Sequence, residues 1–307
     1  MRRLRGEAEF EIMVVDNAST DGSVELIENE FPEVILIKSA RNLGFAAALN
    51  RGFERALGEF YFILNPDTLV PPNSVRKLLS FLDNNSSVGI VGAQLTYLDG
   101  NPQDSTFRFP SLPREFLNYL PEIKAILQPR RWAGNVCKFI TNKDIVENRC
   151  EPFVVDCVSG AALLVRRDVV KQLNGFDDGF FVYHEERDFC RRAWTAGWEV
   201  WSIPTAQVIH LEAQGTGYQR HRLPNFPVLQ WRIAGMDRLW WKHGSPIRHN
   251  LWRMQTRGLL RLRRLPLLLV LPFCGKHKSS LKARIQELKK VIHMLYQKPV
   301  GRCERPE

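Results

Sequence analysis

Short apolar runs alternate with amphipathic, helix-like segments along the first hundred residues. The apolar runs predict buried strands at residues 10–15, 34–37, 60–64 and 88–91. The segments between them predict helices that end near residues 30, 57 and 84. This alternation predicts an α/β fold, an open and mostly parallel doubly wound sheet with helices on both faces.

The pattern changes after residue 98. Proline, glycine and short polar clusters interrupt residues 99–150, which favours a loop-rich insertion over the sheet edge. Regular signals then return as a strand region at 153–165, a helix at 167–173, an acidic helix from residue 185, a strand at 198–203 and another that ends at residue 210. After Pro227 the chain is helical, basic and rich in tryptophan, and residues 281–295 form a last amphipathic helix.

Composition narrows the class of protein. The chain has 307 residues, of which 44% are hydrophobic, so a folded globular protein is expected. Its net charge is +10, and the excess lies mainly after about residue 219. A basic tail suits an anionic partner such as a nucleotide sugar, a lipid diphosphate, an anionic membrane or nucleic acid, although a solvated basic helix surface explains it equally well.

Three features of the sequence argue against a disulfide-rich, a secreted or a membrane-spanning protein. The six cysteines form no CxxC pair and no zinc-like spacing, so reduced thiols of a cytosolic protein are expected. No secretory signal follows Met1. The most apolar stretch, Leu265–Phe273, has nine residues, far fewer than the roughly twenty that span a bilayer.

Three acids, Glu185, Glu186 and Asp188, lie within four residues at the start of a predicted helix. Like charges this close repel one another. A fold tolerates them most easily where a metal, cations or a proton transfer requires them.

Three further motifs follow predicted strands, at the edge where ligands bind in open α/β sheets. Asp16 and Asn17 can accept hydrogen bonds from a nucleoside, or form an Asx turn and helix cap. The Ala-rich segment 41–52 begins a helix whose free N–H groups can approach a phosphate, or simply packs on the sheet. Asp67, in Asn65-Pro66-Asp67, can bind Mg²⁺ or Mn²⁺ on a diphosphate, or belong to a β-turn.

Taken together, these motifs resemble family 2 glycosyltransferases of the GT-A fold, in particular their rhamnosyltransferase-like branch. The resemblance covers roughly residues 10–245. The motifs that carry it are VDNASTDGS at 15–23, RNLGFAAALNRG at 41–52, LNPDT at 64–68, and the stretch from SGAALLVRRD to WSIPTAQVIH at 159–210. It implies transfer of a sugar, with L-rhamnose suggested, from a nucleotide donor with inversion at the anomeric carbon.

The resemblance also implies roles for individual residues. The donor-binding set is Asp16, Asn17, Arg41, Asn42, Gly44, Asn50, Asn65 and Asp67. Asp67 and His210 are the implied ligands of Mg²⁺ or Mn²⁺, and Glu186 is the implied base that deprotonates the acceptor hydroxyl. Glu186 stands where the family usually has Asp, so its carboxylate reaches one methylene farther. Support for the acceptor and for the acidic helix is implied for Gly160, Glu185, Asp188 and Arg192.

One departure concerns the start of the chain. Family members usually begin with a strand–helix unit before the VDN strand, and here only Met1 to Glu9 precedes Phe10. We therefore expect an N-terminally truncated glycosyltransferase domain over residues 1–225 and a basic, tryptophan-containing extension over 226–307.

The leading hypothesis is an inverting transferase that acts on a lipid- or glycan-linked acceptor in cell-surface polysaccharide synthesis. The alternative is a catalytically impaired, transferase-like binding protein. A nucleic-acid partner is not expected, because no recognition motif accompanies the basic tail.

A cytoplasmic protein held peripherally at the inner face of the cytoplasmic membrane is also expected. Cations and aromatic residues near the apolar run suit an anionic bilayer surface, or a helical cap packed on the catalytic domain. These residues are Arg257, Arg261, Arg263, Arg264, Trp240, Trp241 and Trp252.

Overall fold

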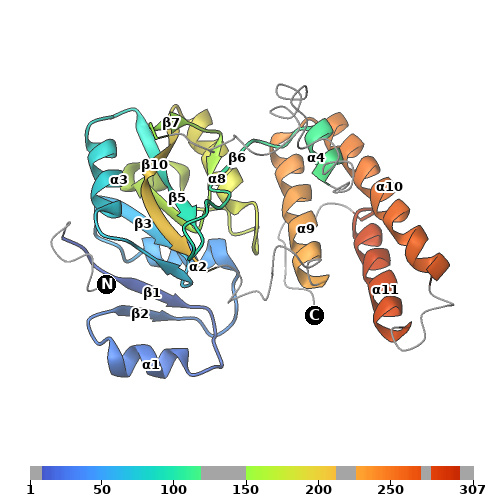
Figure 1. Ribbon diagram of the computed structural model, residues 1–307, viewed down its shortest axis with the longest axis horizontal. Helices are drawn as coiled ribbons and strands as arrows, with labels where there is room; N and C mark the ends of the chain where they lie inside the picture. The colour runs from blue at the N-terminus through green and yellow to red at the C-terminus, as the bar shows by residue number, and fades with distance from the viewer. Residues whose placement is uncertain (1–8, 119–149, 212–225, 271–277, 298–307) are drawn as a thin grey trace. The chain divides into compact units, whose positions relative to one another are not determined.

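The computed structural model describes residues 9–118, 150–211, 226–270 and 278–297 (Figure 1). Contacts divide the chain into two compact units. Residues 1–109 and 143–219 form one, the sheet unit, and residues 110–142 and 220–306 form the other, the helical unit.

The sheet unit alternates strands and helices much as the apolar pattern predicts. Its strands are β1 (Met13–Asp16), β2 (Ile35–Lys38), β3 (Phe60–Leu64), β4 (Thr68–Leu69), β5 (Val88–Thr96), β6 (Thr106–Phe107), β7 (Phe153–Val154), β8 (Cys157–Val158), β9 (Ala162–Arg166) and β10 (Glu199–His210). Its helices are α1 (Ser23–Glu30), α2 (Phe45–Phe53), α3 (Ser74–Asp83), α7 (Arg167–Leu173) and α8 (Glu185–Thr195).

The central sheet has six strands in the order β3-β9-β5-β10-β4, with β7 paired to β10. Strands β5 and β10 are parallel, whereas β9 is antiparallel to both β3 and β5. The direction of β9 differs from the mostly parallel prediction, and an antiparallel neighbour needs no crossover helix. Strands β3, β5 and β10 therefore all run the same way, and their carboxyl ends meet at one edge of the sheet.

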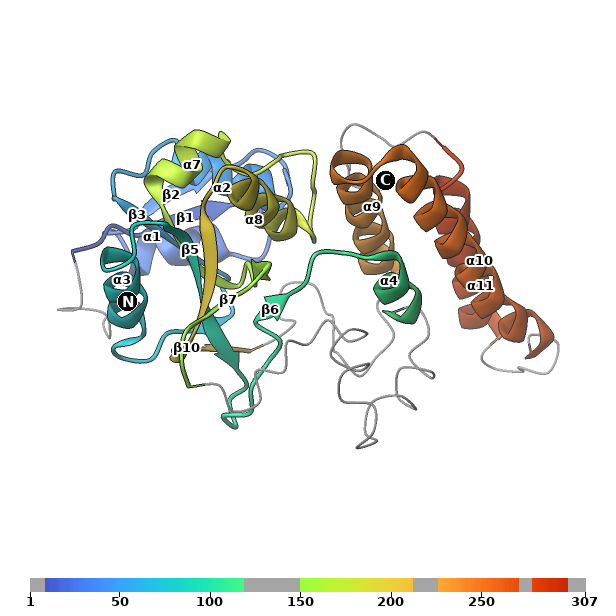
Figure 2. The ribbon, with the colours of Figure 1, turned by 90° about the horizontal axis from the view of Figure 1, so that it is seen from above.

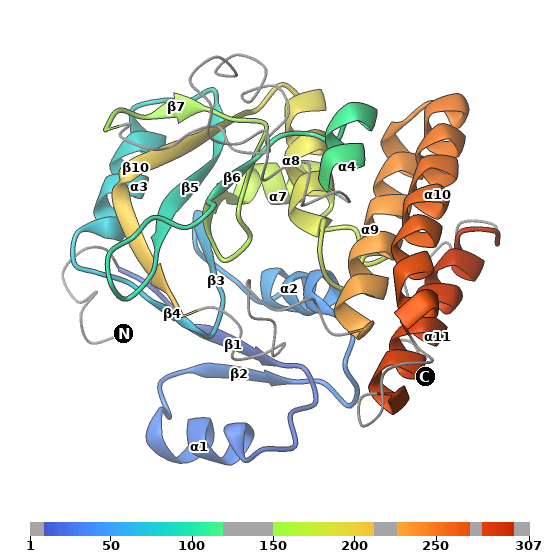
Figure 3. The ribbon, with the colours of Figure 1, turned by 45° about the vertical axis from the view of Figure 1, so that its right-hand side comes forward.

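Strands β1 and β2 form a separate two-stranded parallel sheet, with Met13 opposite Ile35 (Figure 3). Within the described residues, no backbone ladder joins this pair to β3. Side chains make the connection instead. Glu11 accepts hydrogen bonds from the N–H groups of Leu57 (2.6 Å) and Gly58 (3.0 Å), just before β3.

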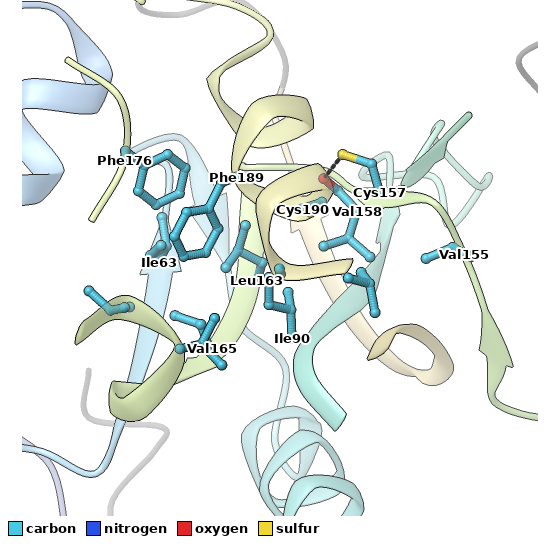
Figure 4. Close-up of a cluster of buried hydrophobic side chains, with 14 of the residues drawn as sticks. Ile63, Ile90, Val155, Cys157, Val158, Leu163, Val165, Phe176, Phe189 and Cys190 are labelled. Carbon is cyan, nitrogen blue, oxygen red and sulfur yellow. Dashed lines mark hydrogen bonds between the residues drawn. The ribbon is translucent and has the colours of Figure 1, made fainter. Parts of the chain in front are cut away.

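Alternate side chains of the central sheet fill two cores. Ile90 and Leu163 pack with residues of α2, α7 and α8 on one face, as Figure 4 shows in part. Their neighbours Val91 and Leu164 pack with residues of α3 on the other face. The two-residue period of a strand thus places helices on both faces, which confirms the predicted fold class.

Some predicted boundaries were wrong. The two strands expected near residues 198–210 are one strand, β10, with a register irregularity between Ile203 and Gln207. Pro204 lies there, and proline has no N–H to give to a ladder. Helix α2 ends at Phe53 rather than near Leu57. Strand β6 and helix α4 (Leu112–Asn118) lie in the segment expected to be loop-rich.

The helical unit contains α4, α9 (Phe226–His243), α10 (Pro246–Val270) and α11 (Lys278–Met294), with α10 and α11 side by side (Figure 2). Its core includes the fully buried Trp252. Asp237 of α9 is buried and lies 2.7 Å from His249 Nε2 and 3.1 Å from Arg253 Nε, so a charged group ties α9 to α10. In the described part of the chain, no helix is both long and apolar enough to cross a bilayer.

Candidate active site

The first motif at the site ends strand β1. The Asp16 side chain is buried, and the Ser19 N–H donates to both of its carboxylate oxygens (3.2 and 3.3 Å). Ala18, with φ of 66°, closes this turn. The carboxylate therefore accepts from the residue three positions on, not two as in an Asx turn, and the residue before α1 is Gly22, which forms no side-chain cap. Contact of Asp16 with a nucleoside stays a prediction.

Asn17, just after β1, forms hydrogen bonds with the segment that leads into α2. Its Nδ2 donates to Asn42 Oδ1 (3.0 Å) and to the Gly44 carbonyl (3.1 Å), and its Oδ1 accepts from the Leu43 N–H (2.8 Å). Asn42 Oδ1 also accepts from the Gly44 N–H (2.9 Å). This network holds the chain that enters α2, with Arg41 exposed beside it.

The N-terminal end of α2 receives a distant loop, residues 175–184. Gly44 has φ of 86°, and a Cβ there would lie 2.4 Å from the Phe181 carbonyl oxygen, so only glycine fits. That same oxygen accepts from the Phe45 N–H (2.7 Å). Asn50 adds two bonds, donating to the Phe176 carbonyl and accepting from the Phe176 N–H, both at 2.8 Å. Asn50 thus anchors this loop, and its contact with donor stays a prediction.

The docked loop leads directly into the acidic helix α8. Tyr183 and His184 both have φ of 72°, a left-handed conformation that costs non-glycine residues energy, and His184 is the residue just before α8. Asp188 is fully buried and accepts from Arg192 Nε (2.7 Å). Arg192 also donates to the carbonyls of Leu173 (2.8 Å) and Gly175 (2.9 Å). Asp188 and Arg192 thus connect α8 to the loop before it, and their predicted role in supporting the acceptor site stays a prediction.

Glu186 is half-buried and lies beside Gly160. A Cβ on Gly160 would lie 3.6 Å from Glu186 Cβ and 3.8 Å from Cε1 of Phe45, the first residue of α2. The structure therefore brings the predicted base close to the helix end that is predicted to face the donor phosphates.

Glu185 has a different environment from its neighbour. Burial, together with the negative charge of Glu186, raises the pKa of the Glu185 carboxyl well above its usual value. No described residue provides a hydrogen-bond partner for its buried Oε2. Two adjacent carboxyls in unlike surroundings can therefore differ in protonation, which separates their chemical roles.

Asp67 and His210 meet at the edge where β3 and β10 end. His210 Nε2 lies 3.3 Å from Asp67 Oδ1, and both side chains are mostly buried. The His210–Thr68 pairing of β10 with β4 and a bond from the Leu211 N–H to the Asp67 carbonyl (2.9 Å) fix this approach. Asn65 lies near this edge, and its carbonyl accepts from Thr68 Oγ1 (2.7 Å).

A carboxylate and an imidazole this close fit a divalent metal. Neighbouring ligands of an octahedral ion bound at about 2.1 Å are about 3.0 Å apart, near the observed spacing. Among the described residues, no group of three His, Cys, Asp or Glu side chains could form a complete metal site. Two protein ligands, with phosphates and water as the others, is the usual arrangement for Mg²⁺ in nucleotide enzymes.

Gln103 also belongs to this edge, although no sequence signal marks it. It is buried, its Oε1 lies 3.0 Å from His210 Nδ1, and its Nε2 donates to the His210 carbonyl (2.6 Å). Gln103 lies in the segment expected to be loop-rich, and only the tertiary fold places it against His210.

Carboxylates, an imidazole and a helix end at the rim of an open α/β sheet are features of enzymes that handle phosphate-linked substrates. A family model described as "Glycosyl transferase family 2" matches residues 2–174. The chain belongs to this glycosyltransferase family, as its motifs indicated.

The chain is also similar to individual proteins. A Mycobacterium tuberculosis protein named N-acetylglucosaminyl-diphospho-decaprenol L-rhamnosyltransferase is 30% identical over 278 residues, which cover 85% of this chain and 84% of the relative. The low-salt glycan biosynthesis hexosyltransferase Agl10 of Haloferax volcanii is 22% identical over 68% of this chain and 60% of its own length. Among solved structures, the mannosyltransferase PcManGT of Pyrobaculum calidifontis, in complex with GDP-Man and Mn²⁺, has a TM-score of 0.48 and 17% identity over 93% of this chain and 74% of its own.

The raised pKa of Glu185 predicts a pH-dependent stability. Above its usual value of 4.5, the folded state retains a proton that the unfolded state loses. This residue's contribution to stability is therefore full below about pH 4.5 and falls as the pH rises toward the folded-state pKa, by up to about 1.4 kcal/mol per pH unit. Glu185→Gln, which mimics the protonated form, should remove that loss. Its midpoint of urea unfolding should exceed that of the unmutated protein by a margin that grows with pH from about 5 upward.

The control is Glu25→Gln, which removes an exposed carboxylate. A constant difference between Glu185→Gln and the unmutated protein at every pH would contradict the protonated state of Glu185.

Proposed function

We propose that this protein transfers a sugar, with inversion, from a nucleotide diphosphate donor to a hydroxyl of a lipid- or glycan-linked acceptor. The observation that carries the proposal is the approach of His210 to Asp67 at the carboxyl edge of the sheet. These residues are far apart in sequence, and both would be ligands of a divalent metal bound to the diphosphate.

The chain's own residues divide the work. Glu186 accepts the proton of the acceptor hydroxyl, and the freed oxygen bonds to the anomeric carbon opposite the leaving group. The bond from that carbon to the diphosphate breaks, and its electron pair leaves with the nucleotide. The exposed Arg41 and the positive end of the α2 dipole favour the phosphates. Asp67 and His210 would hold a Mg²⁺ or Mn²⁺ ion, which when bound would offset negative charge on the diphosphate.

The mycobacterial relative supports a narrower substrate class. Its name specifies L-rhamnose as the sugar and N-acetylglucosaminyl-diphospho-decaprenol as the acceptor. Another relative, from Proteus mirabilis, is named an undecaprenyl-phosphate 4-deoxy-4-formamido-L-arabinose transferase and is 33% identical over 33% of this chain and 31% of its own. We therefore favour a nucleotide-linked L-rhamnose donor and a polyprenyl-linked acceptor in cell-surface polysaccharide synthesis.

A lipid-linked acceptor favours a protein held at the membrane, and α10 offers a surface for it. Side chains of α10 between 42% and 73% exposed recur at helical spacing along one face: Ile247, Leu251, Met254, Leu262, Leu265 and Leu269. We call them the apolar stripe of α10. The helix also contains six arginines and no acidic residue, which suits an anionic bilayer surface.

Two of the three tryptophans expected at the membrane surface are buried instead. Trp240 and Trp252 are buried in the helical unit, and only Trp241 of the three is exposed. Arg257 and Arg261 lie over the ring of Tyr296 on the C-terminal side of α11, so packing within the unit occupies part of the basic set. The proposed membrane surface is therefore the apolar stripe rather than the tryptophan cluster.

Replacement of the base tests the chemical step. Glu186→Gln should lower transfer from nucleotide-linked L-rhamnose by ~10²-fold or more, because an amide cannot accept the hydroxyl proton. Donor affinity, measured by calorimetry, should be unchanged. Glu54→Gln, an exposed carboxylate, is the control. Transfer within a few-fold of the unmutated rate would move the base to another residue. Donor binding with neither transfer nor hydrolysis in the unmutated protein would favour the binding-protein alternative.

Removal of the metal tests the diphosphate site. EDTA should abolish transfer, and added Mn²⁺ or Mg²⁺ should restore it. Asp67→Asn should weaken Mn²⁺-dependent donor binding by about tenfold or more, because a neutral amide is a poorer ligand than a carboxylate. Asp83→Asn, an exposed position at the end of α3, serves as the control. Full activity in chelator would show that the transfer needs no divalent metal.

Vesicle flotation tests the membrane surface. The protein should float with anionic liposomes at low salt and detach at high salt, since its electrostatic attraction is screened. A Leu262→Ser/Leu269→Ser double variant should float less, because it removes apolar area from the stripe. Leu57→Ser/Leu98→Ser removes comparably exposed leucines from the sheet unit and should float normally. Failure of the unmutated protein to float at low salt would refute peripheral attachment through this stripe.

A further inference from the structure

Hydrogen bonds of its backbone fix the position of Gln103. Its N–H donates to the Leu95 carbonyl at 2.8 Å. Its carbonyl accepts from Gln94 Nε2 and from Ser105 Oγ, both at 3.0 Å. The residue is only 6% exposed, so its side chain has a fixed origin and little room to reorient.

The surrounding acceptors determine which way the Gln103 amide points. Gln103 Nε2 lies 2.6 Å from the His210 carbonyl oxygen and 3.4 Å from that of Thr96. Carbonyl oxygens only accept hydrogen bonds, so the NH₂ group must face them, and the reversed amide would place oxygen against oxygen. Gln103 Oε1 therefore faces His210 Nδ1, at 3.0 Å.

This orientation fixes the imidazole of His210. An amide oxygen only accepts, so Nδ1 of His210 must carry the hydrogen. In the neutral ring Nε2 then has the free lone pair, and Nε2 is the nitrogen 3.3 Å from Asp67 Oδ1. Two acceptors facing each other repel unless a proton or a metal ion lies between them. Metal-binding histidines usually donate their other N–H to an oxygen in this way.

We propose that Gln103 is the positioning residue of the metal site: by clamping both the ring and the carbonyl of His210, it presents Nε2 to the divalent cation beside Asp67. This inference rests on the proposed metal role of Asp67 and His210. It assigns the loop between β5 and β6 a part in cation binding. Gln103 does not touch the cation or the substrate itself.

The experiment uses Gln103→Met, which keeps the size of the side chain but removes both of its hydrogen bonds to His210. In the full-length, metal-free protein, ¹⁵N NMR at about pH 8.5, above the ordinary imidazole pKa of about 6.5, reports which ring nitrogen carries hydrogen. His210→Asn identifies the His210 signals among the seven histidines. The unmutated protein should show the Nδ1–H form, and Gln103→Met should show a mixture of both forms.

Calorimetric titration with Mn²⁺ in the presence of dTDP gives the second readout. Gln103→Met should weaken Mn²⁺ binding by about 10–100-fold, the usual effect of losing such a partner. The control is Gln207→Met, an exposed glutamine on the same strand as His210, which should bind normally.

The outcomes distinguish the metal role of His210 from the positioning role of Gln103. If His210→Asn binds Mn²⁺ as tightly as the unmutated protein, the metal role of His210 fails and the positioning role fails with it. If His210→Asn is weakened while Gln103→Met binds Mn²⁺ within about twofold of normal, only the positioning role is overturned. A dominant Nε2–H form in the unmutated protein would also overturn it, and that outcome does not depend on how Gln103→Met folds.

Discussion

The candidate site depends on the docking of loop 175–184 against helix α2. Two hydrogen bonds from Asn50 to the backbone of Phe176 and one from the Phe45 N–H to the Phe181 carbonyl join segments more than 120 residues apart. Neither Gly44 nor Gly175 leaves room for a Cβ at this contact. Because the loop continues directly into α8, the position of Glu186 follows from this contact. Arg192, which donates to two carbonyls before and within the loop, holds the other end of the arrangement.

The acidic helix shows how neighbouring identical side chains acquire different roles. Glu185 is sealed from water, whereas Glu186 is half-buried beside Gly160. A buried carboxyl that retains its proton adds no second negative charge next to the base. The three acids of this segment thus differ: Glu185 is a buried carboxyl with a raised pKa, Glu186 is the candidate base, and Asp188 is paired with Arg192. Both the raised pKa and the arginine pairing reduce the repulsion among them.

Local pattern was sufficient for much of this architecture. The residues at the ends of β1 and β3, Asp16 and Asp67, and the start of the acidic helix at Glu185 lie where apolar periodicity and turn signals placed them. The direction of β9, the continuity of β10 and the separate β1–β2 pair could not be predicted, because strand pairing depends on long-range contacts. The role of Gln103 could not be predicted for the same reason, because a glutamine in a polar loop shows no pattern and only the tertiary fold places it against His210. The burial of Trp240 and Trp252 likewise depends on helix packing, whereas sequence shows only their proximity to arginines.

The separation of the β1–β2 pair from the central sheet has a mechanical consequence. Asp16 belongs to the small sheet and Asp67 follows β3 of the large one, and the described ladders do not connect the two. A donor whose nucleoside touches Asp16 while its diphosphate lies at Asp67 would bridge two sheets that no described backbone ladder connects. The free energy of such a bridge would then appear partly as rigidity, because a ligand that binds only the assembled arrangement stabilises it by mass action. In this protein the substrate would complete the scaffold that positions it.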